Sequence, residues 1–229
     1  MKAIICTKYG PPEVLKLVEI DKPTPKDNEV LIKIHATTAH VGDAKLRGLK
    51  PGLGPVMDFI FKPVMRIMLG FRGPRNKILG MDLAGEIELT GKNVTLFRKG
   101  DQVFASAFEG YKFGAYAEYL CMPEDGLIVL KPGNMSYEEA AALSNGALTA
   151  LCFLKKANIQ KGQKVLIYGA SGSMGTYSVQ IAKYYGAIVT GVCSTANLEM
   201  VKSLGADQVI DYTRENFNDR GETYEPEFD

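Results

Sequence analysis

The sequence predicts an α/β protein in which a β-rich domain, residues 1–122, precedes a doubly wound parallel sheet, residues 123–229. The first observation is a change in the periodicity of apolar residues along the sequence. Short apolar runs closed by Pro, Gly, Asn or Asp fill the first half, and helical patterns enter near Ser136. The second is the order strand, glycine-rich turn, helix, strand over residues 164–193. The third is length, because 229 residues can form one or two domains with a proper core.

The first domain is expected to hold short strands, which span residues 29–35, 82–89, 101–105 and 114–120. Between them, residues 56–71 form an apolar stretch, VMDFIFKPVMRIMLGF, that is too short to cross a bilayer and contains charges. We expect a short helix there, broken near Pro63. A core segment, a lid over a substrate cleft and a peripheral membrane contact all remain open as its role.

The second domain is expected to open with a capping box, Ser-Tyr-Glu-Glu at residues 136–139, at the start of an alanine-rich helix. Gly146 should interrupt this helix, and a second helical stretch should run over residues 147–157. The strand-turn-helix-strand unit follows. A further helix is expected at 197–204, ended by Gly205, and a third short strand at 208–210.

The glycine-rich turn has the composition of a phosphate-binding loop. Glycines let the backbone turn sharply and approach a pyrophosphate, and the N–H groups at the start of the following helix then face the phosphates. The spacing is Gly-x-x-Gly-x-x-Gly, and the flanking strands and helix favour a dinucleotide site over a purely structural turn. The expected contacts are Gly169, Ala170, Ser171, Gly172, Ser173, Met174 and Gly175.

The end of the next strand indicates which dinucleotide binds. NAD sites usually carry an acidic residue there that holds the ribose 2′-hydroxyl. This chain has Ser194, Thr195 and Asn197 instead, whose hydroxyls and amide can donate to a 2′-phosphate. We therefore expect NADPH rather than NADH. Ser194 and Thr195 can also cap the next helix, and the two roles are compatible.

Composition gives no sign of a nucleic-acid or anionic partner. There are 27 Lys and Arg against 26 Asp and Glu, a net charge of +1. The first residues lack the long apolar core of a signal peptide. The four cysteines are far apart and form no C-x-x-C pair, which predicts neither a zinc ribbon nor disulfides. A reduced, cytoplasmic protein without a membrane span fits best.

Several segments together resemble the medium-chain dehydrogenase/reductase superfamily, most closely its zinc-independent quinone oxidoreductase branch. They occur in the family's order over essentially the whole chain, at residues 2–4, 9–15, 80–85, 100–104, 114–119, 148–150, 169–175 and 204–212. The resemblance implies a GroES-like domain followed by a Rossmann domain. It also implies hydride transfer from NADPH to a quinone or to an activated alkene or carbonyl.

The resemblance also assigns individual residues. Thr149 would lie near the nicotinamide, and Tyr212 stands where NADPH-preferring relatives place a tyrosine near the 2′-phosphate. Leu198 departs from the pattern, because many such relatives have a lysine there. The positions of zinc ligands hold His40, Met81 and Asp82 in place of the family's cysteine, histidine and glutamate. A catalytic zinc needs three protein ligands, so we expect no metal.

Without a metal, a conjugated acceptor is easier to reduce than a simple alcohol is to oxidise. The expected partner is therefore a small hydrophobic acceptor, which the sequence does not name. His40 and Asp43 are the candidates for proton transfer, although each can equally be structural. An alcohol dehydrogenase of the same superfamily and a non-catalytic NADPH sensor remain as alternative functions.

Family members continue well beyond Asp229. We therefore expect an incomplete Rossmann domain here, with about three of six strands. The isolated chain should then be weakly active or inactive, and the full-length protein a homodimer.

Overall fold

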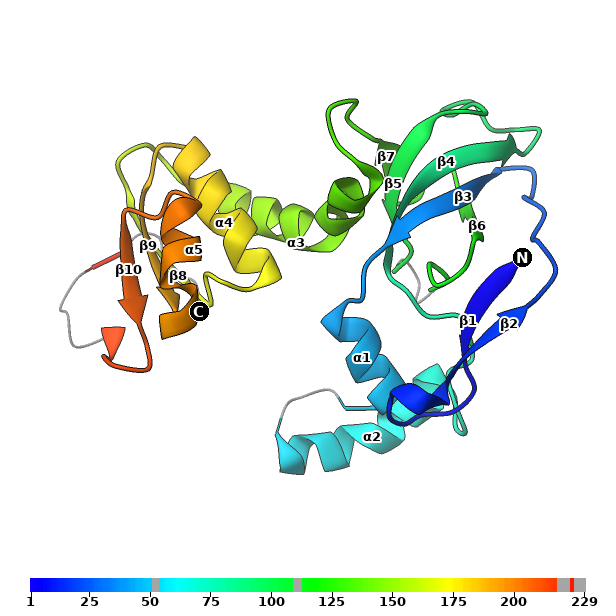
Figure 1. Cartoon of the computed structure of the whole chain (residues 1–229), viewed down its shortest axis with the longest axis horizontal. Coiled ribbons are helices and arrows are strands. Elements are labelled where there is room, and N and C mark those ends of the chain that lie inside the picture. The colour runs from blue at the N-terminus through cyan, green and yellow to red at the C-terminus, as the bar shows by residue number, and fades with distance from the viewer. Residues whose placement is uncertain (51–53, 109–112, 218–222, 225–229) are drawn as a thin grey trace. The chain divides into compact units, whose positions relative to one another are not determined.

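A computed structural model describes residues 1–50, 54–108, 113–217 and 223–224 (Figure 1). The last residues, 225–229, on which the expectation about the chain's end rests, lie outside the described part. The chain packs into two compact units, Met1–Ser144 and Asn145–Asp229, and each is described by itself. The domain limits drawn from the sequence, 122 and 123, stay a prediction.

The first unit is built on a five-stranded antiparallel sheet in the order β6-β3-β4-β5-β7. Its strands are β3 (Glu29–Thr37), β4 (Asp82–Thr90), β5 (Gln102–Ser106), β6 (Tyr119–Pro123) and β7 (Ile128–Leu130). Alternate apolar side chains of these strands point into one core, which holds Val30, Ile32, Leu83, Ile87 and Val103. The strands predicted at 29–35, 82–89 and 101–105 are therefore confirmed.

A two-stranded hairpin forms a separate small sheet, tied by an antiparallel bridge between Ala3 and Ala117 to the segment that leads into β6. It pairs β1 (Lys2–Cys6) with β2 (Leu15–Glu19), and the short 3-10 helix η1 (Pro12–Val14) lies between them. The strand predicted at 114–120 is wrong in its bounds, because regular pairing begins only at Tyr119. The preceding backbone is held elsewhere: the amides of Gly114 and Ala115 both donate to the carbonyl of Gly80 at 3.2 Å.

Two helices complete the lower part of this unit, α1 (Val41–Gly48) and α2 (Pro55–Leu69) (Figure 1). α2 runs on through Pro63, so the predicted break is wrong. Proline deprives the carbonyl of Phe59 of its helical partner. Phe59 is 79% exposed, however, so water can satisfy that carbonyl and the helix continues.

Helix α3 (Tyr137–Lys156) opens with the predicted capping box. The Ser136 amide donates to the Glu139 carboxylate at 2.8 Å, and the Glu139 amide donates to the Ser136 hydroxyl at 3.2 Å. The interruption predicted at Gly146 is wrong, because α3 is continuous. Gly146 serves close packing instead: a Cβ there would lie 2.6 Å from Ser173 Oγ and 3.1 Å from the Tyr177 ring.

The second unit holds a three-stranded parallel sheet in the order β10-β9-β8. The chain runs through β8 (Lys164–Tyr168), α4 (Ser173–Tyr184), β9 (Ile188–Cys193), the 3-10 helix η3 (Thr195–Asn197), α5 (Leu198–Ser203) and β10 (Gln208–Asp211). This order is the strand-helix alternation that the sequence predicts. Within the described residues, every helix of the protein is too short or too polar to cross a bilayer.

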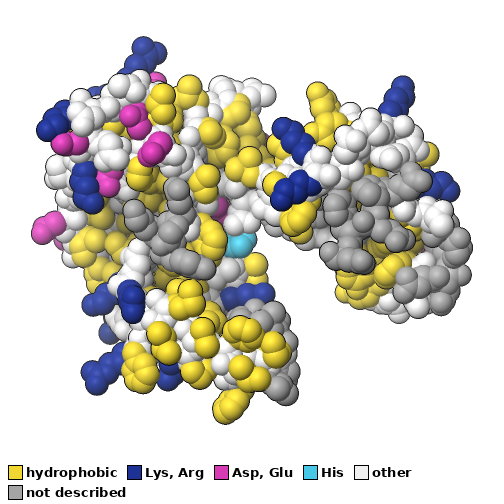
Figure 2. Space-filling view, turned by 180° about the vertical axis from the view of Figure 1, so that it is seen from behind, with side chains coloured by type: hydrophobic (Ala, Val, Ile, Leu, Met, Phe, Trp, Pro, Cys, Tyr) yellow, Lys and Arg dark blue, Asp and Glu magenta, His cyan; other side chains and the backbone are white. Residues whose placement is uncertain are grey.

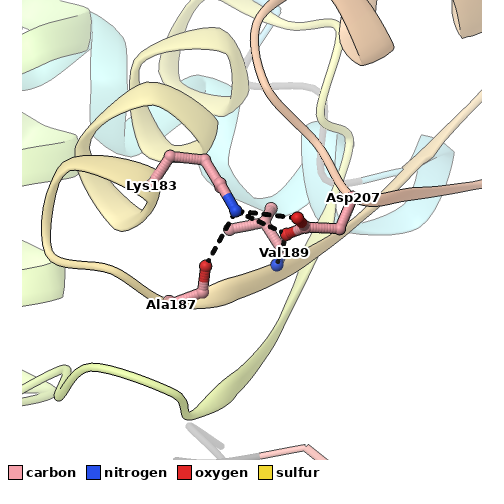
Figure 3. A network of polar contacts seen from close by, with 4 residues as sticks. All are labelled: Lys183, Ala187, Val189 and Asp207. Carbon is pink, nitrogen blue, oxygen red and sulfur yellow. Dashed lines mark hydrogen bonds and ion pairs between the residues drawn. The ribbon is translucent and has the colours of Figure 1, made fainter.

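A partly exposed ion pair ties α4 to the sheet of this unit (Figure 3). Lys183 Nζ contacts both carboxylate oxygens of Asp207, at 2.8 and 2.7 Å, and donates to the carbonyl of Ala187 at 3.1 Å. Asp207 also accepts the amide of Val189 at 2.7 Å. The network thereby joins the end of α4 to β9 and to the loop that leads into β10.

Candidate cofactor and acceptor sites

The turn after β8 folds back on the end of β9. Gly169 has φ of +74°, which favours glycine, and the amides of Gly169 and Ala170 both donate to the carbonyl of Val192 at 3.0 Å. The amide of Gly172 then donates to the carbonyl of Gly169 at 2.9 Å. These bonds place the turn at the carboxyl edge of the parallel sheet, where ligands of such sheets bind.

Gly175 allows α4 to pack directly on this turn. A Cβ at Gly175 would lie 2.2 Å from the carbonyl oxygen of Gly169 and 2.7 Å from Cα of Ala170. Neither neighbour is a flexible side chain that could move aside. The first turn of α4 and the glycine turn therefore approach more closely than any residue with a Cβ permits.

The amino end of α4 is not capped by a side chain. Gly172 occupies the N-cap position and supplies no side-chain acceptor. The amides of Ser173, Met174 and Gly175 have no acceptor within the helix. Gly172, Ser173 and Met174 are exposed, so this end of the helix presents N–H groups and the positive end of its dipole to solvent. This arrangement can bind a phosphate.

The loop after β9 makes its own polar contacts. Asn197 Nδ2 donates to Ser194 Oγ at 3.0 Å, and neither side chain makes a capping bond to η3 or α5. Thr195 donates its hydroxyl to Asp211, the last residue of β10. This bond and the contacts from Thr213 lower the pKa of Asp211. The alternative role of Ser194 and Thr195 as side-chain caps is therefore not seen.

Asp211 and Arg214 are two residues of this loop cluster that sequence reasoning missed. Asp211 pairs in register with Cys193 across the parallel strands, which brings its carboxylate to the loop after β9. Arg214 Nε lies 3.9 Å from Asp211, and its side chain is 78% exposed. The only sequence signal was the position of both residues at the end of a predicted strand, beside Tyr212.

Tyr212 follows β10 and is half-exposed. Its amide donates to the carbonyl of Cys193 at 3.2 Å, and its ring lies 6.3 Å from that of Tyr168, at the end of β8. Tyr168, Tyr212 and Arg214 line one pocket. The structure thus brings Tyr212 together with the strand ends that carry the glycine turn and Ser194.

Thr149 belongs to the same unit. It lies on α3, close to the point where Gly146 meets Ser173, and it is half-buried. The helix that carries Thr149 therefore passes beside the first residue of α4. The expected cofactor residues all lie in the second unit, whereas His40 and Asp43 lie in the first.

In the first unit, His40 and Asp43 line a pocket of about 400 Å³ together with Thr38, Arg47 and Tyr116. His40 is the N-cap of α1, and its Nδ1 accepts the amide of Gly42 at 3.0 Å. Nδ1 therefore carries no proton, and the neutral ring has its proton on Nε2. In this conformation His40 can donate a hydrogen bond through Nε2.

Asp43 ties α1 to the rest of the unit. The side chain is buried, and its two oxygens accept the amide of Gly80 at 3.0 Å and the hydroxyl of Tyr116 at 3.2 Å. Burial raises the pKa of Asp43, and these two bonds oppose that shift. Burial and the neighbouring carboxylate together raise the pKa of Tyr116 above its ordinary value.

The residues at the family's zinc positions have other surroundings. Met81 is part of an apolar cluster with Leu46 and Phe113. Asp82 is buried, and its Oδ2 accepts the Thr38 hydroxyl at 3.1 Å. Burial raises the pKa of Asp82. Among the described residues, no three His, Cys, Asp or Glu side chains gather to hold a metal ion; the expected absence of a metal stays a prediction.

A β unit followed by a parallel unit with a glycine turn at the start of a helix is the arrangement of two-domain dinucleotide-binding proteins. Residues 26–132 match the model of the alcohol dehydrogenase GroES-like domain. The chain belongs to the medium-chain dehydrogenase/reductase superfamily, with quinone oxidoreductases and enone reductases among its relatives.

Two curated relatives illustrate the likeness. The chain is 38% identical to the 2-methylene-furan-3-one reductase of Solanum lycopersicum, over 100% of the chain and 56% of that protein. It is 37% identical to the NADPH-dependent alkenal/one oxidoreductase of Arabidopsis thaliana, over 100% of the chain and 57% of that protein. The chain thus spans little more than half the length of these relatives.

Solved structures agree with this assignment. The quinone oxidoreductase from Coxiella burnetii matches with a TM-score of 0.82 and 35% identity, over 97% of this chain and 66% of that one. The Escherichia coli quinone oxidoreductase complexed with NADPH matches with a TM-score of 0.78 and 28% identity, over 96% and 61%. These relatives support a nicotinamide cofactor.

Proposed function

We propose that the complete protein transfers a hydride from NADPH to a quinone or to an activated alkene or carbonyl. The observation that carries this proposal is the uncapped amino end of α4, packed through Gly175 against the turn at the carboxyl ends of β8 and β9. The names of the Arabidopsis and Escherichia coli relatives, which refer to NADPH, support this cofactor.

Different residues of the second unit would bind different parts of the cofactor. The glycine turn and the first amides of α4 would hold the pyrophosphate, and Thr149 would lie on the nicotinamide side. Ser194, Asn197 and Tyr212 would donate to the 2′-phosphate. We add Arg214 to this group, because it is cationic, exposed and beside Tyr212 in the same pocket. NADPH, when bound, supplies the hydride.

The residues of the first unit would act on the acceptor. Nε2 of His40 would donate a hydrogen bond to an oxygen on which negative charge develops. Asp43 would position α1, and through it His40, because both of its oxygens are already occupied by structural donors. We propose solvent as the source of the proton that completes the reduction, because both oxygens of Asp43 are held by structural donors.

Two alternatives remain, an alcohol dehydrogenase of the same superfamily and an NADPH sensor without turnover. We favour reduction of a conjugated acceptor, because the described residues gather no zinc ligands and conjugation spreads the developing charge. We also propose a cytoplasmic location and a homodimer for the complete protein.

The test is an NADPH oxidation assay on the intact protein with a quinone and an enone, accompanied by metal analysis. Turnover without stoichiometric zinc is expected. Tight NADPH binding without oxidation across a broad acceptor panel would instead favour the sensor. Stoichiometric zinc with alcohol oxidation would establish the alcohol dehydrogenase.

Arg214→Ala tests the cofactor preference. Loss of a charge-assisted contact of about 1.5–3 kcal/mol should raise KM for NADPH at least tenfold and leave KM for NADH nearly unchanged. Arg98→Ala is the matched control, because Arg98 also pairs with an aspartate three residues away, Asp101, and is similarly exposed. Equal effects on the two cofactors would remove Arg214 from the 2′-phosphate site.

A further inference from the structure

Helix α2 shows its apolar side to solvent rather than to its own unit. Side chains at the helical spacing of three and four residues form a stripe along one face. This α2 stripe consists of Met57, Ile60, Phe61, Val64, Ile67 and Met68, which are 43%, 55%, 38%, 47%, 71% and 55% exposed. A globular helix normally buries such a stripe, so an occupant for it is needed.

The other side of α2 makes the contacts with the unit. Asp58, Lys62, Met65 and Leu69 are only half-exposed, and Leu69 packs on the apolar cluster of the lower part of the unit. The helix is therefore anchored by its less apolar side. The α2 stripe stays free of the unit's own core.

Positive charge dominates α2 and the segment that follows it. Lys62, Arg66, Arg72, Arg75 and Lys77 lie on or just after α2, and Asp58 is the one acidic residue between positions 54 and 77. The whole chain's balance of +1 hides this local excess. Figure 2 shows the result on one face: yellow side chains cover the lower end of the larger body, with dark blue around them and no magenta.

Two of these cations are held near the C-terminal end of α2. Arg75 Nη2 donates to the carbonyl of Ile67 at 3.0 Å, and the Arg66 guanidinium lies 6.0 Å from the centre of the Phe71 ring. Phe71 itself is 73% exposed. Cationic groups and an exposed aromatic ring therefore lie together at the C-terminal end of α2.

We propose that α2 and the basic segment after it form a docking surface for an anionic lipid bilayer. An interfacial helix lies in the plane of the membrane, with its apolar face among the acyl chains and its Lys and Arg side chains at the lipid phosphates. The stripe, the aromatic rings and the local charge of α2 match each part of this pattern. The 15 residues of the helix do not span the bilayer.

Charge separates this occupant from a second copy of the chain. A two-fold contact through the α2 stripe would bring Arg75, which is held at Ile67, and the basic segment around it in both copies together, and like charges oppose such a contact. An anionic surface gains from those charges instead. Binding should therefore weaken as salt is added.

The experiment is co-sedimentation of the intact protein with vesicles of phosphatidylcholine alone or of phosphatidylcholine with phosphatidylglycerol. Binding to the anionic vesicles and little binding to the neutral ones is expected. The double variant Ile60→Ser/Ile67→Ser should lower the partition coefficient at least about tenfold. Arg72→Gln/Lys77→Gln should lower it about fivefold per charge removed, because both side chains are exposed in the segment after α2.

Leu96→Ser/Leu127→Ser is the matched apolar control, because these side chains are 65% and 54% exposed but lie in loops between strands of the five-stranded sheet. It should bind like the wild type. The chain contains no tryptophan, so Ile67→Trp adds a fluorescent reporter on the stripe, whose emission should shift to the blue only with anionic vesicles.

Three results would overturn the proposal. The first is no binding of the intact protein to anionic vesicles. Blue-shifted emission of the Ile67→Trp variant without vesicles would then show that another part of the intact protein covers α2. The second is an oligomer that the Ile60→Ser/Ile67→Ser variant dissociates. The third is an Ile60→Ser/Ile67→Ser variant that binds anionic vesicles like the wild type but has a raised KM for a water-soluble acceptor. That result would make α2 a lid.

Discussion

Gly175→Ala tests whether the approach of α4 to the glycine turn is what holds the cofactor cradle together. The new Cβ would lie 2.2 Å from the carbonyl oxygen of Gly169, about 1.2 Å short of ordinary contact at 3.4 Å. Alanine would otherwise stabilise a helix by up to about 1 kcal/mol. Overpacking against backbone costs about 1–3 kcal/mol or more, so a net loss of about 1–2 kcal/mol is expected.

The same displacement should move the first amides of α4 away from the phosphates. We expect the dissociation constant of NADPH to rise about tenfold, because a shift of about 1 Å breaks several hydrogen bonds at once. Thermal unfolding followed by circular dichroism and a fluorescence titration with NADPH measure the two effects in the intact protein.

Gly48→Ala is the control for this substitution. Gly48 is also helical, and its Cβ would meet only the Lys50 side chain, at 3.8 Å. That variant should be as stable as the wild type or slightly more stable. A Gly175→Ala protein with wild-type stability and wild-type affinity for NADPH would refute the reasoning.

Two further predictions concern polar contacts. Tyr116→Phe leaves a buried oxygen of Asp43 without its donor, so the free energy of unfolding should fall by about 1–3 kcal/mol in urea titrations, and an unchanged midpoint would contradict this. Burial alone would raise the pKa of Asp207, but the Lys183 ammonium and the Val189 amide lower it below 3.8. The contribution of the Lys183–Asp207 pair is therefore present above pH 3.8 and is lost as the pH falls through the lowered pKa. Both side chains are about a third exposed, which limits the effect to about 1 kcal/mol. In the Asp207→Asn variant, the free energy of unfolding should fall less steeply at acid pH than in the wild type. An unchanged fall would show that the Lys183–Asp207 pair does not contribute to stability.

Local patterns predicted the second unit well because each element there carries its own signal. Hydrophobic periodicity and turn-forming residues predict each of these elements: the strand before the glycine turn, the helix after it, and the strands at 188–193 and 208–211. The capping box at 136–139 is equally local. These features need no knowledge of distant contacts.

The errors have tertiary causes. Gly146 reads as a helix breaker in sequence, but it is required by the nearness of Ser173, a residue far along the chain. Pro63 is tolerated because its helix is open to solvent. The contact of Thr195 with Asp211 depends on the parallel register of β9 and β10, which no single segment encodes.

The continuous course of α3 has a practical consequence for dividing this protein. The boundary between the two compact units, at Ser144 and Asn145, falls in the middle of that helix, between Tyr137 and Lys156. Proteases need an extended segment, so limited digestion should not cleave at this boundary as it does in an unstructured linker. An expressed fragment that begins or ends there would contain half a helix, and fragments of either unit should retain all of α3.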